Sequence, residues 1–190
     1  MWNVLLDPLP EDWKGYPIDT DFQTGIQIIQ CMNDDELSVR ERLYTAINLL
    51  FPERVPDNAE AEKALSWYLN EYHHDNNAGE SFDTPVMDFD IDQWRIYAAF
   101  LSQYNIDLNT TKMHWFTFMG LLSNLNECSF TSVMDIRNKK INSKMEPEER
   151  KSILKAKKVF AIKPKKQEKE ELTLAEQQAV DEFVALINKK

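Results

Sequence analysis

Three aspartates at alternate positions, Asp88, Asp90 and Asp92, are the residues whose type and spacing come closest to a metal site. A calcium loop that began at Asp88 would need glycine at its sixth position and a bidentate glutamate at its twelfth. The sequence has Gln93 and Ala99 there. A helix start explains the same residues, with Asp90 as N-cap, Gln93 three positions later, and Asp92 complementing the helix dipole. The aspartates therefore predict a helix start and no metal site.

The histidines and cysteines do not form a catalytic motif. His73 and His74 are adjacent, so on a helix they would point about 100° apart and could not chelate one ion. We expect His114 to be a hydrogen-bonded residue in or beside the core. Pairing Cys128 with His114 for nucleophilic catalysis would require an orienting group and an oxyanion site, and no HExxH, GxSxG or CxxC motif occurs. The sequence predicts a protein that is not an enzyme and has no cofactor.

Composition predicts one soluble domain with an appendage. Hydrophobic residues make up 43% of 190 residues, and the four glycines are isolated, which excludes a glycine-rich phosphate loop. Cys31 and Cys128 suit a reducing cytoplasm. The N-terminal residues predict no secretory signal, and no apolar run approaches the roughly 20 residues that span a bilayer, so we expect no membrane association.

Charge is divided unevenly along the chain. Residues 1–136 contain 7 Lys and Arg against 23 Asp and Glu, whereas residues 137–190 contain 15 against 9. The basic segment 150–166 has an apolar side formed by Ile153, Ala156, Val159 and Phe160, which predicts a solvated helix packed on the body. Because no aromatic residues interleave with the basic ones, we expect no nucleic-acid partner. The charge division also suits attraction between parts of one chain or between neighbouring copies.

Helix signals recur, and persistent β alternation is absent, so the sequence predicts an all-α fold. A capping residue followed three positions later by Glu or Gln occurs at Thr20/Gln23, Asn33/Glu36, Asp57/Glu60, Asp90/Gln93 and Thr173/Glu176. Helical stripes follow two of these pairs: Leu43, Tyr44, Ile47, Leu50 and Phe51, and then Ala61, Ala64, Leu65, Tyr68 and Tyr72.

Residues 73–85 predict a loop, and helices are expected at about 90–104, 110–125, 130–140 and 147–160, the last one beginning at Pro147. In the first of these helices, Trp94, Tyr97, Ala98, Leu101 and Tyr104 recur at helical spacing. Segment 113–122 is apolar nearly all round and predicts a central buried helix. Gly120 within it predicts a close contact between helices.

The chain divides into a helical domain (1–160), a charged linker (161–171) and a C-terminal amphipathic helix (172–190). We predict that this last helix binds a partner, through the apolar residues Leu172, Val180, Phe183, Val184 and Ile187. Its alternative is to fold back on the chain's own core.

Four segments resemble a known phage family. They are IDTDFQTGIQIIQ (18–30), FDIDQWRIYAAFLSQYNIDL (89–108), HWFTFMGLLSNL (114–125) and IRNKKINSKMEPEERKSILKAKK (136–158). Together they make the chain similar to the tail assembly chaperone-like proteins of long-tailed phages and prophages of Gram-positive bacteria. These motifs are aromatic and structural, so the resemblance implies no active site.

The resemblance implies a helical protein that keeps the long tape measure protein soluble in the host bacterial cytoplasm. Such a protein assists polymerisation of the major tail protein, associates with copies of itself, and is absent from the mature virion. Many phages make two overlapping forms by frameshifting, and the sequence does not say which form this is. The other interpretation left open is a generic helical interaction module or regulator with one globular partner.

Overall fold

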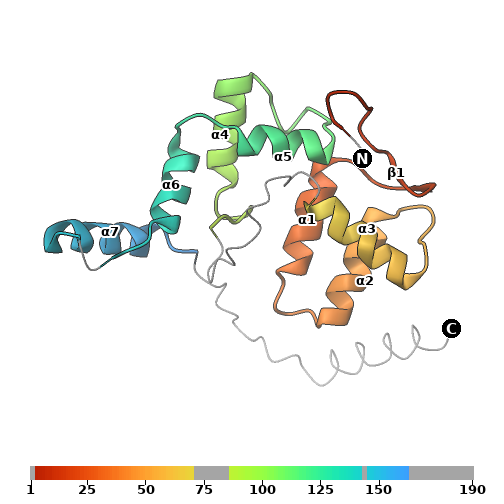
Figure 1. Cartoon of the computed structure of the whole chain (residues 1–190), viewed down its shortest axis with the longest axis horizontal. Coiled ribbons are helices and arrows are strands. Elements are labelled where there is room, and N and C mark those ends of the chain that lie inside the picture. The colour runs from red at the N-terminus through yellow and green to blue at the C-terminus, as the bar shows by residue number, and fades with distance from the viewer. Residues whose placement is uncertain (1–2, 71–85, 143–144, 163–190) are drawn as a thin grey trace, which may run out of the picture.

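The computed structural model describes residues 3–70, 86–142 and 145–162, and seven α-helices and one short β-hairpin make up this part of the chain. The elements up to residue 70 are β1 (Asp12–Trp13), β2 (Tyr16–Pro17), α1 (Phe22–Met32), α2 (Val39–Leu50) and α3 (Asn58–Asn70). The elements from residue 86 onward are α4 (Gln93–Tyr104), α5 (Trp115–Ser123), α6 (Ser129–Asn138) and α7 (Pro147–Phe160). The predicted all-α class is confirmed. In Figure 1, α1, α2 and α3 group together, while α4, α6 and α7 follow one another toward the opposite end.

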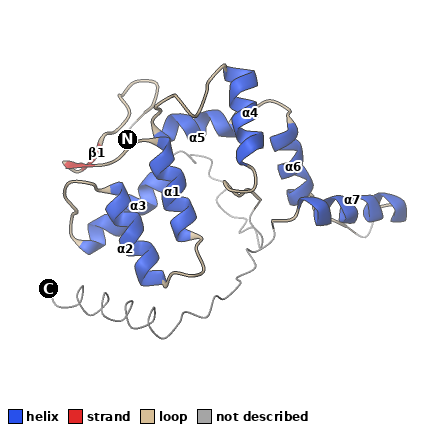
Figure 2. Ribbon diagram, turned by 180° about the vertical axis from the view of Figure 1, so that it is seen from behind, coloured by secondary structure: helices blue, strands red, loops and turns tan. Residues whose placement is uncertain are grey.

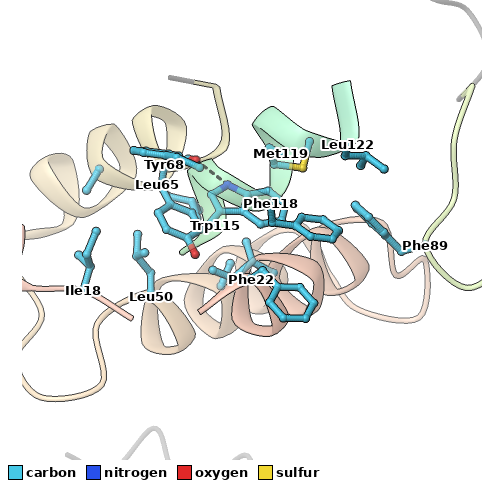
Figure 3. Close-up of a cluster of buried hydrophobic side chains, with 14 of the residues drawn as sticks. Ile18, Phe22, Leu50, Leu65, Tyr68, Phe89, Trp115, Phe118, Met119 and Leu122 are labelled. Carbon is cyan, nitrogen blue, oxygen red and sulfur yellow. Dashed lines mark hydrogen bonds between the residues drawn. The ribbon is translucent and has the colours of Figure 1, made fainter. Parts of the chain in front are cut away.

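The centre of the core is α5, as the apolar segment 113–122 predicted. Its buried residues are Trp115, Phe116, Phe118, Met119 and Leu122. Trp115 lies between Tyr68 and Phe22 in Figure 3, and its indole Nε1 donates a hydrogen bond to the Tyr68 carbonyl oxygen at 3.0 Å. Phe118 stacks on Phe22 of α1 and Phe100 of α4, with ring centroids 4.9 and 5.1 Å apart. The aromatic rings of α5 therefore join the α1–α3 group to α4.

Close helix contact occurs at Gly25 of α1, and the predicted contact at Gly120 is wrong. A Cβ atom on Gly25 would lie 2.2 Å from Cε3 of Trp115, far inside van der Waals contact. A Cβ on Gly120 would meet nothing within 4 Å. Helix α1 can therefore approach the indole of α5 only because residue 25 has no side chain.

The predicted starts of the first two helices are displaced. Helix α1 is capped by Asp21, one residue after the predicted Thr20. The Asp21 carboxylate accepts a hydrogen bond from the Gln23 backbone N–H at 3.0 Å. Helix α2 is capped by a reciprocal box between Ser38 and Glu41, whereas Asn33 ends α1. Asn33 fails as an N-cap because its own N–H donates to carbonyls of the last turn of α1. The spacing rule was met twice within a few residues, and the second pair formed the box.

Other local predictions hold. Asp57 accepts a hydrogen bond from the Glu60 N–H at 3.1 Å at the start of α3, and α7 begins at Pro147. The α3 stripe is buried at Ala61, Ala64, Leu65 and Tyr68. In the α2 stripe, Ile47, Leu50 and Phe51 are buried and Leu43 is half-buried. Tyr44, the remaining member of that stripe, is 68% exposed, so the predicted stripe is buried only in part.

The side of α4 that faces the core coincides only in part with the predicted stripe. Ile96, Ala99 and Phe100 face the core. Of the predicted set, Trp94, Ala98 and Leu101 are exposed, and Tyr97 and Tyr104 are half-buried. Helix α4 is apolar on both sides, so helical spacing alone could not select the buried side.

Helix α7 lies beyond α6 and apart from α1–α3, as Figures 1 and 2 show. None of its residues is buried. Ile153, Ala156 and Phe160 are half-buried, but Val159 is 67% exposed, which corrects its predicted packing. Within the described ranges, no helix is both long and apolar enough to cross a bilayer.

Four predictions fall outside the residues that the structure describes. They are the loop at 73–85, the packing of Tyr72, the Thr173/Glu176 cap, and the linker and helix beyond Ile162. The boundaries 1–160, 161–171 and 172–190 stay predictions.

Candidate partner-binding groove

The predicted partner-binding residues are Leu172, Val180, Phe183, Val184 and Ile187, and all of them lie outside the described ranges. That prediction stays untested. The described part of the chain offers a different surface, between α1 and α4.

A groove with a volume of about 320 Å³ opens between α1 and α4. Its lining is mostly apolar and consists of Phe22, Gln23 and Ile26 from α1, Phe89, Gln93, Trp94, Ile96 and Tyr97 at α4, Leu108 and Asn109 from the following loop, and Phe118 from α5. Phe89 and Phe118 are buried and have ring centroids 6.2 Å apart, so the groove reaches the aromatic core that Figure 3 shows. Gln23, Gln93 and Asn109 supply the amide groups. This chemistry suits the apolar side of a partner with a few polar contacts.

An apolar stripe continues from the groove along the exposed side of α4. We define the α4 stripe as Trp94, Ala98 and Leu101, which follow one another at intervals of four and three residues; Ile91, also exposed, lies just before the helix begins. Trp94 is 75% exposed and Leu101 is 43% exposed. The indole of Trp94 meets the Tyr97 ring edge-on, with centroids 5.9 Å apart, so Trp94 of the stripe is in contact with a second residue that lines the groove.

Intervals of three and four residues are those of a coiled-coil seam, in which each side chain packs among four of a facing helix. A stripe with this spacing that lacks a facing helix in the described chain is an exposed apolar surface of the kind that marks an interaction site.

The aspartates of the segment hold the start of α4 in place. The Asp88 carboxylate accepts hydrogen bonds from the N–H groups of Asp90 and Ile91, each at 2.8 Å. The Gln30 side-chain amide of α1 donates to the Asp90 carboxylate, and Gln93 donates to the Asp90 carbonyl oxygen at 2.7 Å. These bonds place the beginning of the stripe against α1, so Asp90 connects two sides of the groove.

Asp92 has a role that sequence reasoning missed. It occupies the N-cap position of α4, which corrects the predicted cap at Asp90, and its carboxylate is fully buried and makes no side-chain cap bond. Arg137 of α6 donates to Oδ2 at 2.5 Å and to Oδ1 at 3.1 Å, and Arg95 donates to Oδ1 at 2.9 Å. The carboxylate that the metal hypothesis invoked is thus neutralised by two guanidinium groups.

Arg137 joins two further segments to this carboxylate. Its Nε donates to the Phe160 carbonyl oxygen at the end of α7 at 2.6 Å, and its Nη1 donates to the Val86 carbonyl oxygen at 3.0 Å. The guanidinium is only 6% exposed. One side chain therefore fixes the end of α6, the end of α7 and the start of α4 together.

The remaining reactive side chains are engaged structurally. His114 caps α5: its Nδ1 accepts a hydrogen bond from the Phe116 N–H at 3.1 Å, and its Nε2 lies 3.0 Å from the Pro10 carbonyl oxygen, to which it donates. Burial lowers the pKa of His114, which favours this neutral form. Its expected role as a hydrogen-bonded residue at the edge of the core is confirmed. Burial, then the charge of Asp34, raises the pKa of the Cys31 thiol.

Cys128 starts α6, and its sulfur accepts a hydrogen bond from the Thr131 hydroxyl at 3.7 Å. Neither ring nitrogen of His114 is directed to a cysteine in these contacts. Among the described residues, no group of three or more His, Cys, Asp and Glu is placed to hold a metal ion. What the surface around α4 offers is apolar contact area, not a reacting group.

The groove could have been foreseen in part. The signal was that α4 carries two apolar sides, while a monomeric core needs one. The pairing of α1 with α4 depends on tertiary contacts that no local pattern encodes.

Comparison with known proteins identifies the family of the chain. No curated protein and no solved structure matches the chain. A family model described as "Bacteriophage Gp15 protein" matches residues 5–162, which include every helix described above. The chain belongs to the bacteriophage Gp15 protein family.

Proposed function

We propose that this phage protein is a tail assembly chaperone, which binds the tape measure protein, keeps it soluble and assists polymerisation of the major tail protein. It acts by binding, without catalysis or a cofactor, in the host bacterial cytoplasm, and leaves before the virion is complete. The observation that carries the proposal is the unpaired α4 stripe beside an apolar groove.

The spacing of the stripe selects its partner. A side chain every three or four residues along one helix packs best against a second helix, and a long helix offers many successive sites of this kind. A tape measure is expected to expose apolar helical stripes along its length, which would aggregate unless covered. Several copies of this chain, each bound weakly through the groove, would cover such a helix by avidity.

Charge supports reversible binding. The body of the protein is acidic, and apolar contact surrounded by like charge on neighbouring copies favours modest affinity per copy. Tail tube subunits that bind the same helix more tightly would displace the copies as they polymerise. Membership of a phage family and the resemblance of segments 89–108 and 114–125 to tail chaperones point to the same role.

The test is co-expression of the tape measure protein encoded in the same phage with the full chain, scored as soluble tape measure by size-exclusion chromatography with light scattering. We expect the Trp94→Ser variant to lower the soluble, co-eluting tape measure roughly tenfold, because an exposed tryptophan is a frequent centre of binding energy. Leu5→Ser is the matched control, since Leu5 is 87% exposed and lies outside the groove.

Two results would contradict the proposal. If Trp94→Ser solubilises the tape measure as well as the natural chain does, the groove is not the binding surface. If the natural chain elutes alone, and also does so with any frameshifted form added, the chaperone role fails. A stable complex of fixed stoichiometry with one globular protein would instead support the interaction-module alternative.

A further inference from the structure

Helix α7 presents an exposed side on which basic and apolar residues alternate. We define the α7 face as Lys151, Leu154, Lys155, Lys158 and Val159, all of them exposed. Leu154 is 50% exposed and Val159 is 67% exposed, and the 14-residue helix buries no residue at all. A helix of this length with one side unpacked receives little stabilisation from tertiary packing. The α7 face therefore has the composition of a docking surface.

The fold holds this face away from the acidic body of its own chain. Arg137 bonds the end of α7 through the Phe160 carbonyl oxygen, and Lys139 of the α6–α7 connection lies 3.9 Å from Glu149. The ring of Phe160 lies under the Arg95 guanidinium at 5.9 Å. Figure 1 shows the consequence: α7 is at one end of the molecule, and the α1–α2 turn is not beside it. An intramolecular partner for the α7 face is absent from the described chain.

The α1–α2 turn offers complementary chemistry. Residues 34–42 contain four carboxylates, Asp34, Asp35, Glu36 and Glu41, against the two arginines at positions 40 and 42. Arg42 is occupied locally, since it donates to the carbonyl oxygen of Leu37 and pairs with Asp35. Val39, at the start of α2, is exposed among these carboxylates. An apolar side chain set in negative charge thus matches apolar side chains set in positive charge on α7.

We propose that the α7 face of one copy docks on the α1–α2 turn of a second copy. The two surfaces are different, so the contact is heterologous, and a heterologous contact that does not close into a ring builds an open row of copies. Neither surface includes the groove or the α4 stripe, which stay accessible along the row. The inference concerns the chain alone and stands independently of the proposed function.

The test is sedimentation velocity of the full chain without any partner, over a range of concentrations and salt. We expect the average mass to rise steadily with concentration beyond that of a dimer, and to fall as salt screens the opposite charges. A donor variant, Leu154→Glu with Val159→Glu, and an acceptor variant, Glu36→Lys with Val39→Ser, should each weaken association roughly tenfold or more. These side chains are exposed, and circular dichroism would check that the variants fold.

Mixing the two variants gives the sharpest result. Each keeps one intact surface, so an equimolar mixture should form a one-to-one dimer and nothing larger. Trp94→Ser is the control and should associate like the natural chain, which separates this inference from the role of the groove.

Three outcomes would overturn the inference: a monomer at every concentration, oligomers that neither double variant weakens, or a mixture that stays monomeric. Binding of a fluorescent DNA oligonucleotide to the full chain is measured in the same experiment. If the natural chain binds the oligonucleotide, the donor variant does not bind it, and no self-association is seen, the α7 face is a nucleic-acid surface instead.

Discussion

Replacing Arg137 with methionine should destabilise the protein strongly, because this side chain neutralises a carboxylate that has no access to water. Asp92 is fully buried and the Arg137 guanidinium is 6% exposed. Methionine keeps much of the volume of the arginine stem but removes both bonds to Asp92. It also removes the bonds to the carbonyl oxygens of Val86 and Phe160.

The magnitude follows from the remaining partner. Removing one member of a buried ion pair costs about 3–5 kcal/mol, since the other charge is left uncompensated. Arg95 still donates to Asp92 at 2.9 Å, and its side chain is 31% exposed, so it compensates in part. We therefore expect a loss near the lower end, about 3 kcal/mol, which for a chain of this size is a fall in Tm of roughly 6–12 °C.

Urea unfolding followed by circular dichroism measures the loss, and Arg150→Met is the matched control. Arg150 is an exposed arginine of α7, and its replacement should change the free energy of unfolding by less than about 0.5 kcal/mol. Adding Asp92→Asn to Arg137→Met should recover part of the loss, because the buried charge is then gone. A loss below about 1 kcal/mol for Arg137→Met would refute the reasoning, because a buried carboxylate that keeps only the partly exposed Arg95 as its partner should cost more than that.

Four other substitutions test the core and its edge. Gly25→Ala should lower the free energy of unfolding by about 1–3 kcal/mol, because the new methyl group overlaps the indole of Trp115, whereas Gly120→Ala should raise it by about 0.5–1 kcal/mol; urea midpoints compare the two. Tyr68→Phe should leave the free energy of unfolding unchanged or raise it by up to about 1 kcal/mol, because the buried hydroxyl has no hydrogen-bond partner in the described structure. Thermal unfolding measures this change, and a marked loss of stability would mean that the hydroxyl does have a partner. His114 has a pKa lowered by burial, so its stabilising contribution is full above its ordinary pKa of 6.5 and is lost as pH falls through the lowered value. Urea midpoints at pH 7.5 and 5.5 should therefore differ more in the natural chain than in His114→Asn, and equal differences would contradict the assignment.

Local patterns predicted the parts of this fold that local forces decide. The apolar segment 113–122 became α5, and Pro147 began α7, because burial on all sides and proline at a first turn each leave few alternatives. The cap of α2 was misplaced because Asn33 and Ser38 both precede a suitable glutamate, and only the chain's path after α1 decides between them.

The candidate site depended on long-range contacts and was largely unpredictable. Asp92 was placed at a helix start, which is correct locally, but its partner Arg137 is 45 residues away in sequence and carries no local mark. The side of α4 that faces the core is chosen by Phe118, which packs against Phe100. Spacing could show that α4 has two apolar sides, but not which of them the rest of the chain would leave exposed.

The fit between Gly25 and Trp115 restricts the order in which this sequence can change. A side chain at position 25 is excluded while the indole is present, whereas a smaller residue at position 115 would leave a cavity and free the hydrogen-bond acceptor at Tyr68. A substitution at either position is therefore harmful alone, and the two can be exchanged only as a pair whose effects do not add. In evolutionary terms we expect epistasis between the two sites, so that related chains in which residue 25 is not glycine should also lack the tryptophan.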